Sequence, residues 1–163
     1  LSHRGLLYVD RVSSVKMKPR TQPKIITMLL VENNNGEVLL QKRSKQPYIN
    51  TWTLPYGKIH IDDTDLLQAA IREAEEKLNT TPEELTHLGD CYIRVSHEGV
   101  IESTTLAHVV RARAGVALKD DNLQWVAPLQ LNSLALAPAV TQIIQRSLAS
   151  AGLFFEEYTV GTS

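Results

Sequence analysis

The sequence predicts an α+β fold in which a mixed β-sheet lies between α-helices. Two observations favour this class: short apolar segments bounded by turn residues recur along the chain, and two longer segments repeat their apolar residues with helical period. Their order is strands, helix, strands, helix, as in a sheet whose faces are covered by helices. The chain has 163 residues, 43% of them apolar, which corresponds to about one domain with its own core.

Composition argues against several classes of protein. Seventeen Lys and Arg residues against 18 Asp and Glu leave a net charge of −1, which argues against a nucleic-acid coat. The single cysteine, Cys91, permits no internal disulfide and is expected in a buried strand. No segment approaches the roughly 18 consecutive apolar residues of a membrane helix, and the first residues show no secretory pattern. We therefore expect a cytoplasmic protein that does not associate with membranes.

We expect the chain to divide into three parts. Residues 1–23 form an N-terminal arm and connector, because the segment before residue 24 has poor periodicity and two prolines that lack a backbone donor. Residues 24–150 form the folded domain. Residues 151–163 form a C-terminal tail.

The folded domain is expected to begin with a β-hairpin. Residues 24–32 are rich in Ile, Met, Leu and Val, and they lead into three asparagines and Gly36. Asparagine and glycine tolerate the positive φ of a tight turn, so residues 37–43 should pair back as the second strand.

The first helix is expected from about residue 65 to residue 78. Asp62, Asp63, Thr64 and Asp65 supply its N-cap, and residues 79–82 end it. Glu73 and Glu76 should project away from the apolar stripe. The stripe expected to face the core consists of Leu67, Ile71, Ala74 and Leu78.

Further strands are expected at 91–95, 104–111 and 123–126. Turns should separate them at Gly89, Gly99, Gly115 and residues 120–122. A last amphipathic helix should span about residues 139–148 and turn four apolar residues inward, namely Val140, Ile143, Ile144 and Leu148.

The functional information lies between the second strand and the end of the first helix. The segment Trp52-Thr53-Leu54-Pro55-Tyr56-Gly57-Lys58 is followed on the helix by Arg72-Glu73-Ala74-Glu75-Glu76. This pattern resembles the Nudix family, whose box reads Gly, five residues, Glu, seven residues, then Arg-Glu-apolar-x-Glu-Glu-x-Gly-apolar. The hairpin, the strand at 39–43, Trp125-Val126 and the closing helix also fall where that family places them, so the resemblance covers most of residues 24–148. It implies a Nudix-type sandwich and a pyrophosphohydrolase.

Hydrolysis of a diphosphate requires neutralised phosphate oxygens and a polarised water, and carboxylates that hold Mg²⁺ or Mn²⁺ provide both. Glu73 and Glu76 are three apart, so they can share one face of the helix and hold the metal. The resemblance implies that Arg72 orients these glutamates. It also implies a further carboxylate from the later turn and strand, where Glu98 or Glu102 could serve as ligand or base.

Four residues are candidates for contact with the substrate: Gly57, Lys58, Arg43 and Lys77. Lys58 could touch a phosphate or could merely lie in an exposed loop. Arg43, on the second strand, could reach an anionic substrate.

The sequence departs from the box at four places. Counting forward from Gly57 puts the early acidic position at Asp63, whereas counting back from Arg72 puts it at Thr64, so one residue has been inserted. Lys77 stands where the box has its last Glu, Asn79 replaces the box glycine, and Tyr56 replaces the glycine usually found before Gly57. Lys77 should lie within a few ångströms of Glu73. Its ammonium either lowers metal affinity or pairs with a substrate phosphate.

Two main hypotheses follow. The first is a Nudix-type hydrolase that cleaves a nucleoside diphosphate-linked substrate with Mg²⁺ or Mn²⁺, and the second is an inactive Nudix-fold module that binds a ligand or regulates a partner. An isomerase like isopentenyl diphosphate isomerase is a weaker third, because no cysteine follows Trp52. We expect a nucleotide-type small molecule as partner and no direct nucleic-acid binding, and the sequence leaves a homodimer open.

Overall fold

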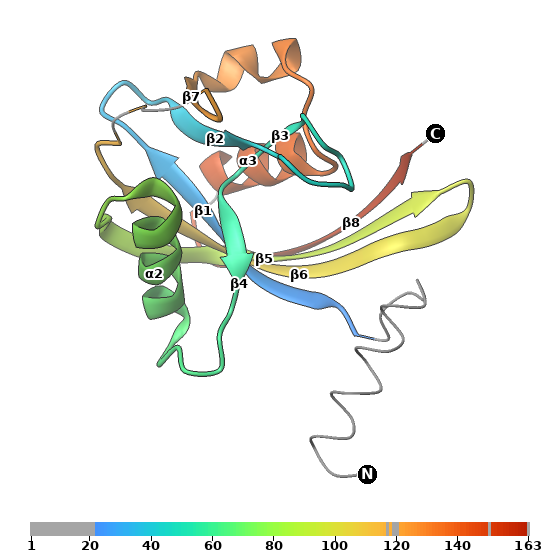
Figure 1. The fold of residues 1–163 in the computed structure, drawn as a ribbon, viewed down its shortest axis with the longest axis horizontal. Helices are drawn as coiled ribbons and strands as arrows, with labels where there is room; N and C mark the ends of the chain where they lie inside the picture. The colour runs from blue at the N-terminus through green and yellow to red at the C-terminus, as the bar shows by residue number, and fades with distance from the viewer. Residues whose placement is uncertain (1–21, 117, 119–120, 150, 163) are drawn as a thin grey trace.

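A computed structural model describes residues 22–116, 118, 121–149 and 151–162. Most of the expected N-terminal arm and residue 120 of the expected turn at 120–122 lie outside these residues. Eight strands of the described chain form one mixed sheet, with the order β3-β2-β1-β6-β5-β8; β4 also pairs with β1, and β7 with β2 (Figure 1). The elements are β1 (Lys24–Glu32), β2 (Val38–Lys42), β3 (Trp52–Thr53), β4 (Tyr56–Lys58), α2 (Leu66–Leu78), β5 (Glu83–His97), β6 (Val100–Arg113), β7 (Leu123–Val126), a short 3₁₀ helix (Pro128–Ser133), α3 (Val140–Ala149) and β8 (Phe154–Thr162).

Strand β1 lies at the centre of the sheet. It pairs in parallel with β6 along its whole length and antiparallel with β2 and β4, which makes the sheet mixed, as predicted. The expected tight turn after β1 is present: Gly36 has φ +74°, and the Asn33 side-chain oxygen accepts hydrogen bonds from the backbone N–H groups of Asn35 and Glu37, each at 3.0 Å.

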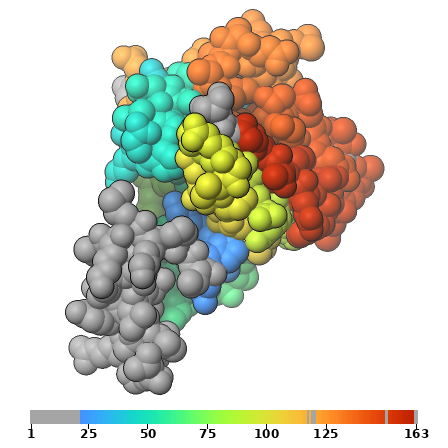
Figure 2. All heavy atoms as spheres, turned by 90° about the vertical axis from the view of Figure 1, so that its right-hand side faces the viewer, coloured from blue at the N-terminus to red at the C-terminus, as the bar shows by residue number. Residues whose placement is uncertain are grey.

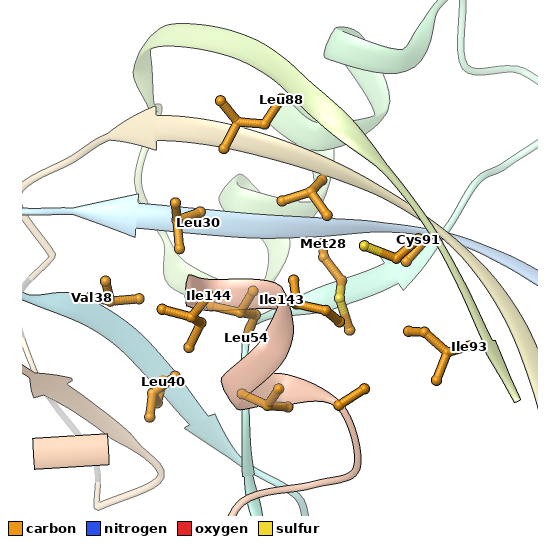
Figure 3. Packing of buried hydrophobic residues seen from close by; sticks show 14 of the residues in the cluster. Met28, Leu30, Val38, Leu40, Leu54, Leu88, Cys91, Ile93, Ile143 and Ile144 are labelled. Atoms are coloured by element: carbon orange, nitrogen blue, oxygen red, sulfur yellow. The ribbon is translucent and has the colours of Figure 1, made fainter. Parts of the chain in front are cut away.

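The two helices cover opposite faces of the sheet, because alternate residues of β1 pack against each. Met28 and Leu30 belong to the cluster that includes Ile143 and Ile144 of α3, which Figure 3 shows. Leu29 and Val31 belong to a second cluster, which includes Ala70, Ala74 and Leu78 of α2. The predicted layer architecture, a sheet between helices, is therefore confirmed. No described helix is long and apolar enough to cross a membrane.

The buried face of α2 differs from the expected stripe. Ala74 and Leu78 are buried as expected, but Leu67 is 37% exposed, whereas Glu73, expected to point outward, is 3% exposed. Ile71 is half-buried. Small side chains explain the difference: Ala69, Ala70 and Ala74 let the helix lie close to the sheet, and Gly57 leaves room for the Glu73 carboxylate. The prediction was wrong for Leu67 and Glu73 because it ranked residues by apolarity alone.

Gly89 was expected in a turn, and this prediction was wrong. It lies inside β5, next to a β-bulge between His87 and Gly89. A side chain at this position would place its Cβ 2.5 Å from the Phe154 carbonyl oxygen, so glycine is required here by close packing. In strands, glycine often marks such a bulge or close approach.

Strand β8 was not predicted, and it lies in the stretch expected to be a tail. It pairs in parallel with β5 at the edge of the sheet. Figure 2 shows this C-terminal segment in red beside the yellow turn of the β5–β6 hairpin. Its residues alternate between more and less buried positions, starting with buried Phe154 and exposed Phe155. Cys91 of β5 is buried as expected, and burial raises the pKa of its thiol to about 12.

Candidate functional site

Strand β4 and helix α2 meet at Gly57. A Cβ at this position would lie 1.8 Å from the Glu73 carboxyl carbon and 1.9–2.1 Å from its two oxygens. The glycine is therefore required because a carboxylate packs directly on the backbone of β4. This contact joins the Trp-x-x-Pro-x-Gly segment to the helix and brings Gly57 and Glu73 together.

Arg72 links the loop before α2 to the glutamates of the helix. Its Nε and Nη2 atoms each donate to one oxygen of Asp63 at 2.9 Å, a bidentate pairing, and Nη2 also donates to the Lys58 carbonyl at 3.0 Å. Its Nη1 atom donates to Glu73 Oε1 at 2.9 Å and to Glu76 Oε2 at 3.3 Å. One guanidinium thus orients both glutamates, the arrangement that the family resemblance implied.

Counting from the two ends of the box gave two candidates for its early acidic position, Asp63 and Thr64, and the structure distinguishes them. Asp63, not Thr64, pairs with Arg72, so the extra residue follows Asp63. The hydrogen bonds from Arg72 hold the pKa of the Asp63 carboxyl at about 2, below its ordinary value of 3.8. The same pairing raises the pKa of Arg72. Sequence reasoning found this position by counting but did not assign Asp63 a partner.

Glu73 lies between two cations. Its Oε1 atom accepts from Arg72, while its Oε2 atom is buried and accepts no hydrogen bond from any described residue. The Lys77 ammonium lies 3.6 Å from Oε2, close to Glu73 as expected. It also donates to the Tyr56 carbonyl and lies 5.0 Å from the centre of the Tyr56 ring. Lys77 therefore holds a positive charge beside a buried carboxylate and a backbone carbonyl.

The other two expected carboxylates, Glu76 and Glu102, have different surroundings. Glu76 is on the same helix as Glu73, and its side chain is 56% exposed. Glu102 accepts a hydrogen bond from the Tyr48 hydroxyl at 3.2 Å, which joins the β5–β6 hairpin to the loop before β3. Among the described residues, Glu73, Glu76 and Glu102 do not form a group of three ligand atoms within 4.8 Å of one another.

Two adjoining cavities open beside this site. The first, of about 280 Å³, is lined by the side chains or backbone of four basic residues and of Gln41, Ser44, Thr53 and Tyr56. The four basic residues are Lys42, Arg43, Lys45 and Lys77. The second, of about 110 Å³, is mostly apolar, with Met28, Ile93 and Val95 among its lining residues.

Arg43, Thr53 and Tyr56 line both cavities. Arg43 donates through Nη1 to the Tyr56 hydroxyl and through Nε to the Pro47 carbonyl at 2.9 Å. These two hydrogen bonds hold the guanidinium where the cavities adjoin. Lys58, by contrast, is exposed and contributes its carbonyl to Arg72. In the sequence, Tyr56 stands out only as a departure from the box, and its place in the lining of both cavities was not predicted. The available signals were its position next to Gly57 and the alternation of side-chain directions along β4.

Comparison with known proteins gives a family and a fold. The NUDIX domain model matches residues 22–147. The chain is similar in structure to the MutT protein from Bacillus halodurans, with a TM-score of 0.66 at 22% identity over 83% of this chain and 90% of that chain. No curated protein gives a significant match.

Two further structures share the fold at low identity. The NUDIX domain of Shewanella oneidensis NrtR, crystallised with ADP ribose, has a TM-score of 0.62 and 18% identity over 85% of this chain and 96% of that one. NrtR crystallised with a 27mer DNA has a TM-score of 0.60 and 20% identity, covering 77% of this chain but 59% of that chain. A relative of this fold thus binds DNA, and the absence of nucleic-acid binding by this chain stays a prediction.

Proposed function

The chain belongs to the Nudix family, and from that premise we propose that it hydrolyses the diphosphate of a nucleoside diphosphate-linked small molecule. The observation that carries this proposal is the pair of adjoining cavities, one basic and one mostly apolar, which share Arg43, Thr53 and Tyr56. A molecule with phosphates next to an apolar or aromatic group matches that division. The ADP ribose bound by the NrtR domain has this chemistry and is the first substrate to test.

The residues beside the basic cavity suit a hard divalent cation, Mg²⁺ or Mn²⁺. Glu73 presents a buried oxygen that accepts no hydrogen bond within the described chain, and Glu76 adds an exposed carboxylate held by the same arginine. Oxygen donors of this kind are the ligands that these ions prefer. When bound, the ion would neutralise the phosphate oxygens and polarise the attacking water. We assign Glu73 and Glu76 to it and leave Glu102 out, because Glu102 pairs with Tyr48.

The chain's own side chains would do the remaining work. Arg72 keeps Glu73 and Glu76 in place, and the exposed Glu76 carboxylate can accept the proton of the attacking water. Lys42, Arg43 and Lys45 neutralise phosphate charge from the cavity wall. Lys77 has a flexible stem and a partly exposed side chain, so it can turn from Glu73 toward a phosphate.

Lys77 also favours a second candidate function, a module that binds the nucleotide without cleaving it. Its ammonium contacts Glu73 and the Tyr56 carbonyl, two oxygens that would otherwise attract a metal ion. A chain that supplies this positive charge itself can hold a diphosphate with no metal. Hydrolysis would then be slow or absent.

The test is a hydrolysis screen with ADP-ribose, NADH, nucleoside triphosphates and dinucleoside polyphosphates, each with Mg²⁺ and with Mn²⁺. We expect turnover that falls about 100-fold or more in Glu76→Gln but not in Glu75→Gln, a control at an exposed position on the same helix. If no compound is cleaved yet calorimetry detects ADP-ribose binding, the binding module is correct. If nothing is cleaved or bound, both proposals fail.

Substitution of Lys77 separates its two roles. If the ammonium only impairs metal binding, Lys77→Glu should tighten Mn²⁺ binding and raise turnover, and Lys77→Gln should give a smaller change in the same direction. If it binds phosphate, both variants should raise KM even at saturating metal. A lack of effect on metal affinity, KM and kcat would show that the assignment of Lys77 to the box is wrong.

A further inference from the structure

Three metal-ligating side chains converge on the α2 face of the sheet, outside the site described above. His87 and Asp90 belong to β5, and His108 belongs to β6. His87 Nε2 lies 2.8 Å and His108 Nδ1 lies 2.6 Å from the same oxygen, Asp90 Oδ1. The three ligand atoms lie within 4.8 Å of one another, and all three side chains are partly exposed.

The backbone of β5 is built in a way that produces this convergence. Residues three apart in a regular strand point to opposite faces, so His87 and Asp90 should not meet. The bulge between His87 and Gly89 removes the mismatch: Leu88 packs in the α3-side core, while His87 and Asp90 both point to the α2 side. Asp90 is directly opposite His108 in the pairing of β5 with β6.

The cluster and the contact between Gly57 and Glu73 lie along the same row of paired residues across the sheet, but on different strands. Gly57 is opposite Thr27, Thr27 is opposite His108, and His108 is opposite Asp90. His108 is therefore two strands from Gly57, or about 10 Å at the usual strand spacing. Between them lies the buried Thr27. Glu73 is not part of the group of ligand atoms around Asp90, so an ion held by the histidines would be distinct from one held by Glu73.

We propose that His87, Asp90 and His108 form a binding site for a transition-metal ion, Zn²⁺ being the best match. Two imidazole nitrogens and one carboxylate form a ligand set that favours Zn²⁺ over Mg²⁺, in contrast to the oxygen donors of Glu73 and Glu76. Three protein ligands at a partly exposed site leave a coordination position for water. The proposal does not depend on the diphosphate activity.

Small movements would convert the observed cluster into a coordination sphere. Ligand atoms around a tetrahedral Zn²⁺ lie about 3.3 Å apart, given bonds of about 2.0–2.2 Å. The two nitrogens are already closer than this to Asp90 Oδ1, and a rotation of the Asp90 side chain opens the space between them. Both ring nitrogens lie within hydrogen-bond distance of the same carboxylate oxygen, so they are directed at one point.

The experiment measures binding of Zn²⁺ and Co²⁺ alone to the full chain, by calorimetry and by the visible absorption of Co²⁺. We expect one ion per chain at this site with nitrogen ligation. In metal sites, loss of a residue that only hydrogen-bonds to a ligand weakens metal binding about 10- to 100-fold. Because His108 and Asp90 are proposed as ligands themselves, His108→Ala and Asp90→Asn should weaken Zn²⁺ binding at least about 100-fold. The matched controls are His97→Ala, which removes another imidazole from β5, and Glu73→Gln; neither should change this affinity.

Asp90→Asn keeps the shape of the side chain, so it remains informative if His108→Ala does not fold. A measurement on the unaltered chain adds a direct reading: Co²⁺ should broaden the imidazole NMR signals of His87 and His108 before those of His97. The proposal is overturned if the unaltered chain binds no Zn²⁺ up to millimolar concentration, or if His108→Ala and Asp90→Asn bind it as tightly as the unaltered chain does.

Discussion

Helices α2 and α3 cover opposite faces of one sheet, yet different kinds of residue pack them. Helix α3 buries Val140, Ile143 and Ile144, and its one buried polar residue, Ser147, donates its hydroxyl to the Ile143 carbonyl at 2.7 Å. Helix α2 instead buries three alanines, one leucine (Leu78) and the Glu73 carboxylate. The α3 side is therefore packed by large apolar side chains, some of which also line the apolar cavity, whereas α2 gives up apolar burial to hold charged groups against β4.

The largest effect that tests this comparison is expected on α3. Ile143 is fully buried, so Ile143→Ala should lower the free energy of unfolding by about 2–5 kcal/mol. Leu67→Ala on α2 removes a side chain of similar size that is 37% exposed, and it should cost less than about 1 kcal/mol. Urea denaturation measures both. Equal losses would mean that α2 packs like α3 and that its apolar stripe was assigned correctly from the sequence.

The next effect concerns the close approach of α2 to β4. Gly57→Ala places a methyl group where the Glu73 carboxylate lies, and because that carboxylate is also held by Arg72 we expect a loss of about 3 kcal/mol. Gly115→Ala is the control, since its Cβ would meet no atom within 4 Å. The double variant Gly57→Ala/Glu73→Ala should recover part of the loss. No recovery would place the strain elsewhere than at Glu73.

Sequence reasoning predicted the α3 face better than the α2 face for a physical reason. Periodicity reports apolar residues, and burial of apolar area is what decides the packing of Val140, Ile143 and Ile144. The burial of Glu73 depends on the absence of a side chain at Gly57, which lies 16 positions earlier in the chain, and no local pattern records that contact. The family box joins the glycine and the glutamates in one motif but does not say that they touch, so Glu73 was still expected to point outward.

Contacts between distant parts of the chain also determine the structure at the other end of the sheet. Gly89 suggested a turn by composition, but the close approach of Phe154 requires glycine there, and that strand had been assigned to a tail. The convergence of His87, Asp90 and His108 follows from a bulge and from strand pairing. The spacing of His87, Asp90 and His108 along the chain shows neither where a bulge lies nor how the two strands are paired.

A smaller effect is expected when Arg72, which links Asp63 to the glutamates of α2, is replaced by another cation of different geometry. Arg72→Lys retains a cation but cannot make two parallel hydrogen bonds to Asp63 while it also reaches Glu73. We expect a loss of about 1.5 kcal/mol, at the lower end for charged hydrogen bonds, because the Arg72 side chain is still 16% exposed. Arg94→Lys, at an exposed position on β5, should change stability by less than about 0.5 kcal/mol. If Arg72→Lys costs no more stability than Arg94→Lys, the geometry of the guanidinium at position 72 is unimportant for stability.

The smallest effect is a dependence of stability on acid that belongs to the α2 face. Hydrogen bonding from Arg72 lowers the pKa of Asp63 from 3.8 to about 2 in the folded chain, so the unfolded chain takes up this proton more readily. The stabilisation from the Asp63–Arg72 pair is therefore nearly complete above about pH 4 and is lost as the pH falls through 2. The free energy of unfolding of the unaltered chain should exceed that of Asp63→Asn at pH 5, and most of this difference should be gone by pH 2. Asp62→Asn, which removes an exposed carboxylate from the same loop, shows how much of the difference is general to that loop. A gap between the unaltered chain and Asp63→Asn that stays constant from pH 5 to pH 2 would mean that the carboxylate does not stabilise the fold through Arg72.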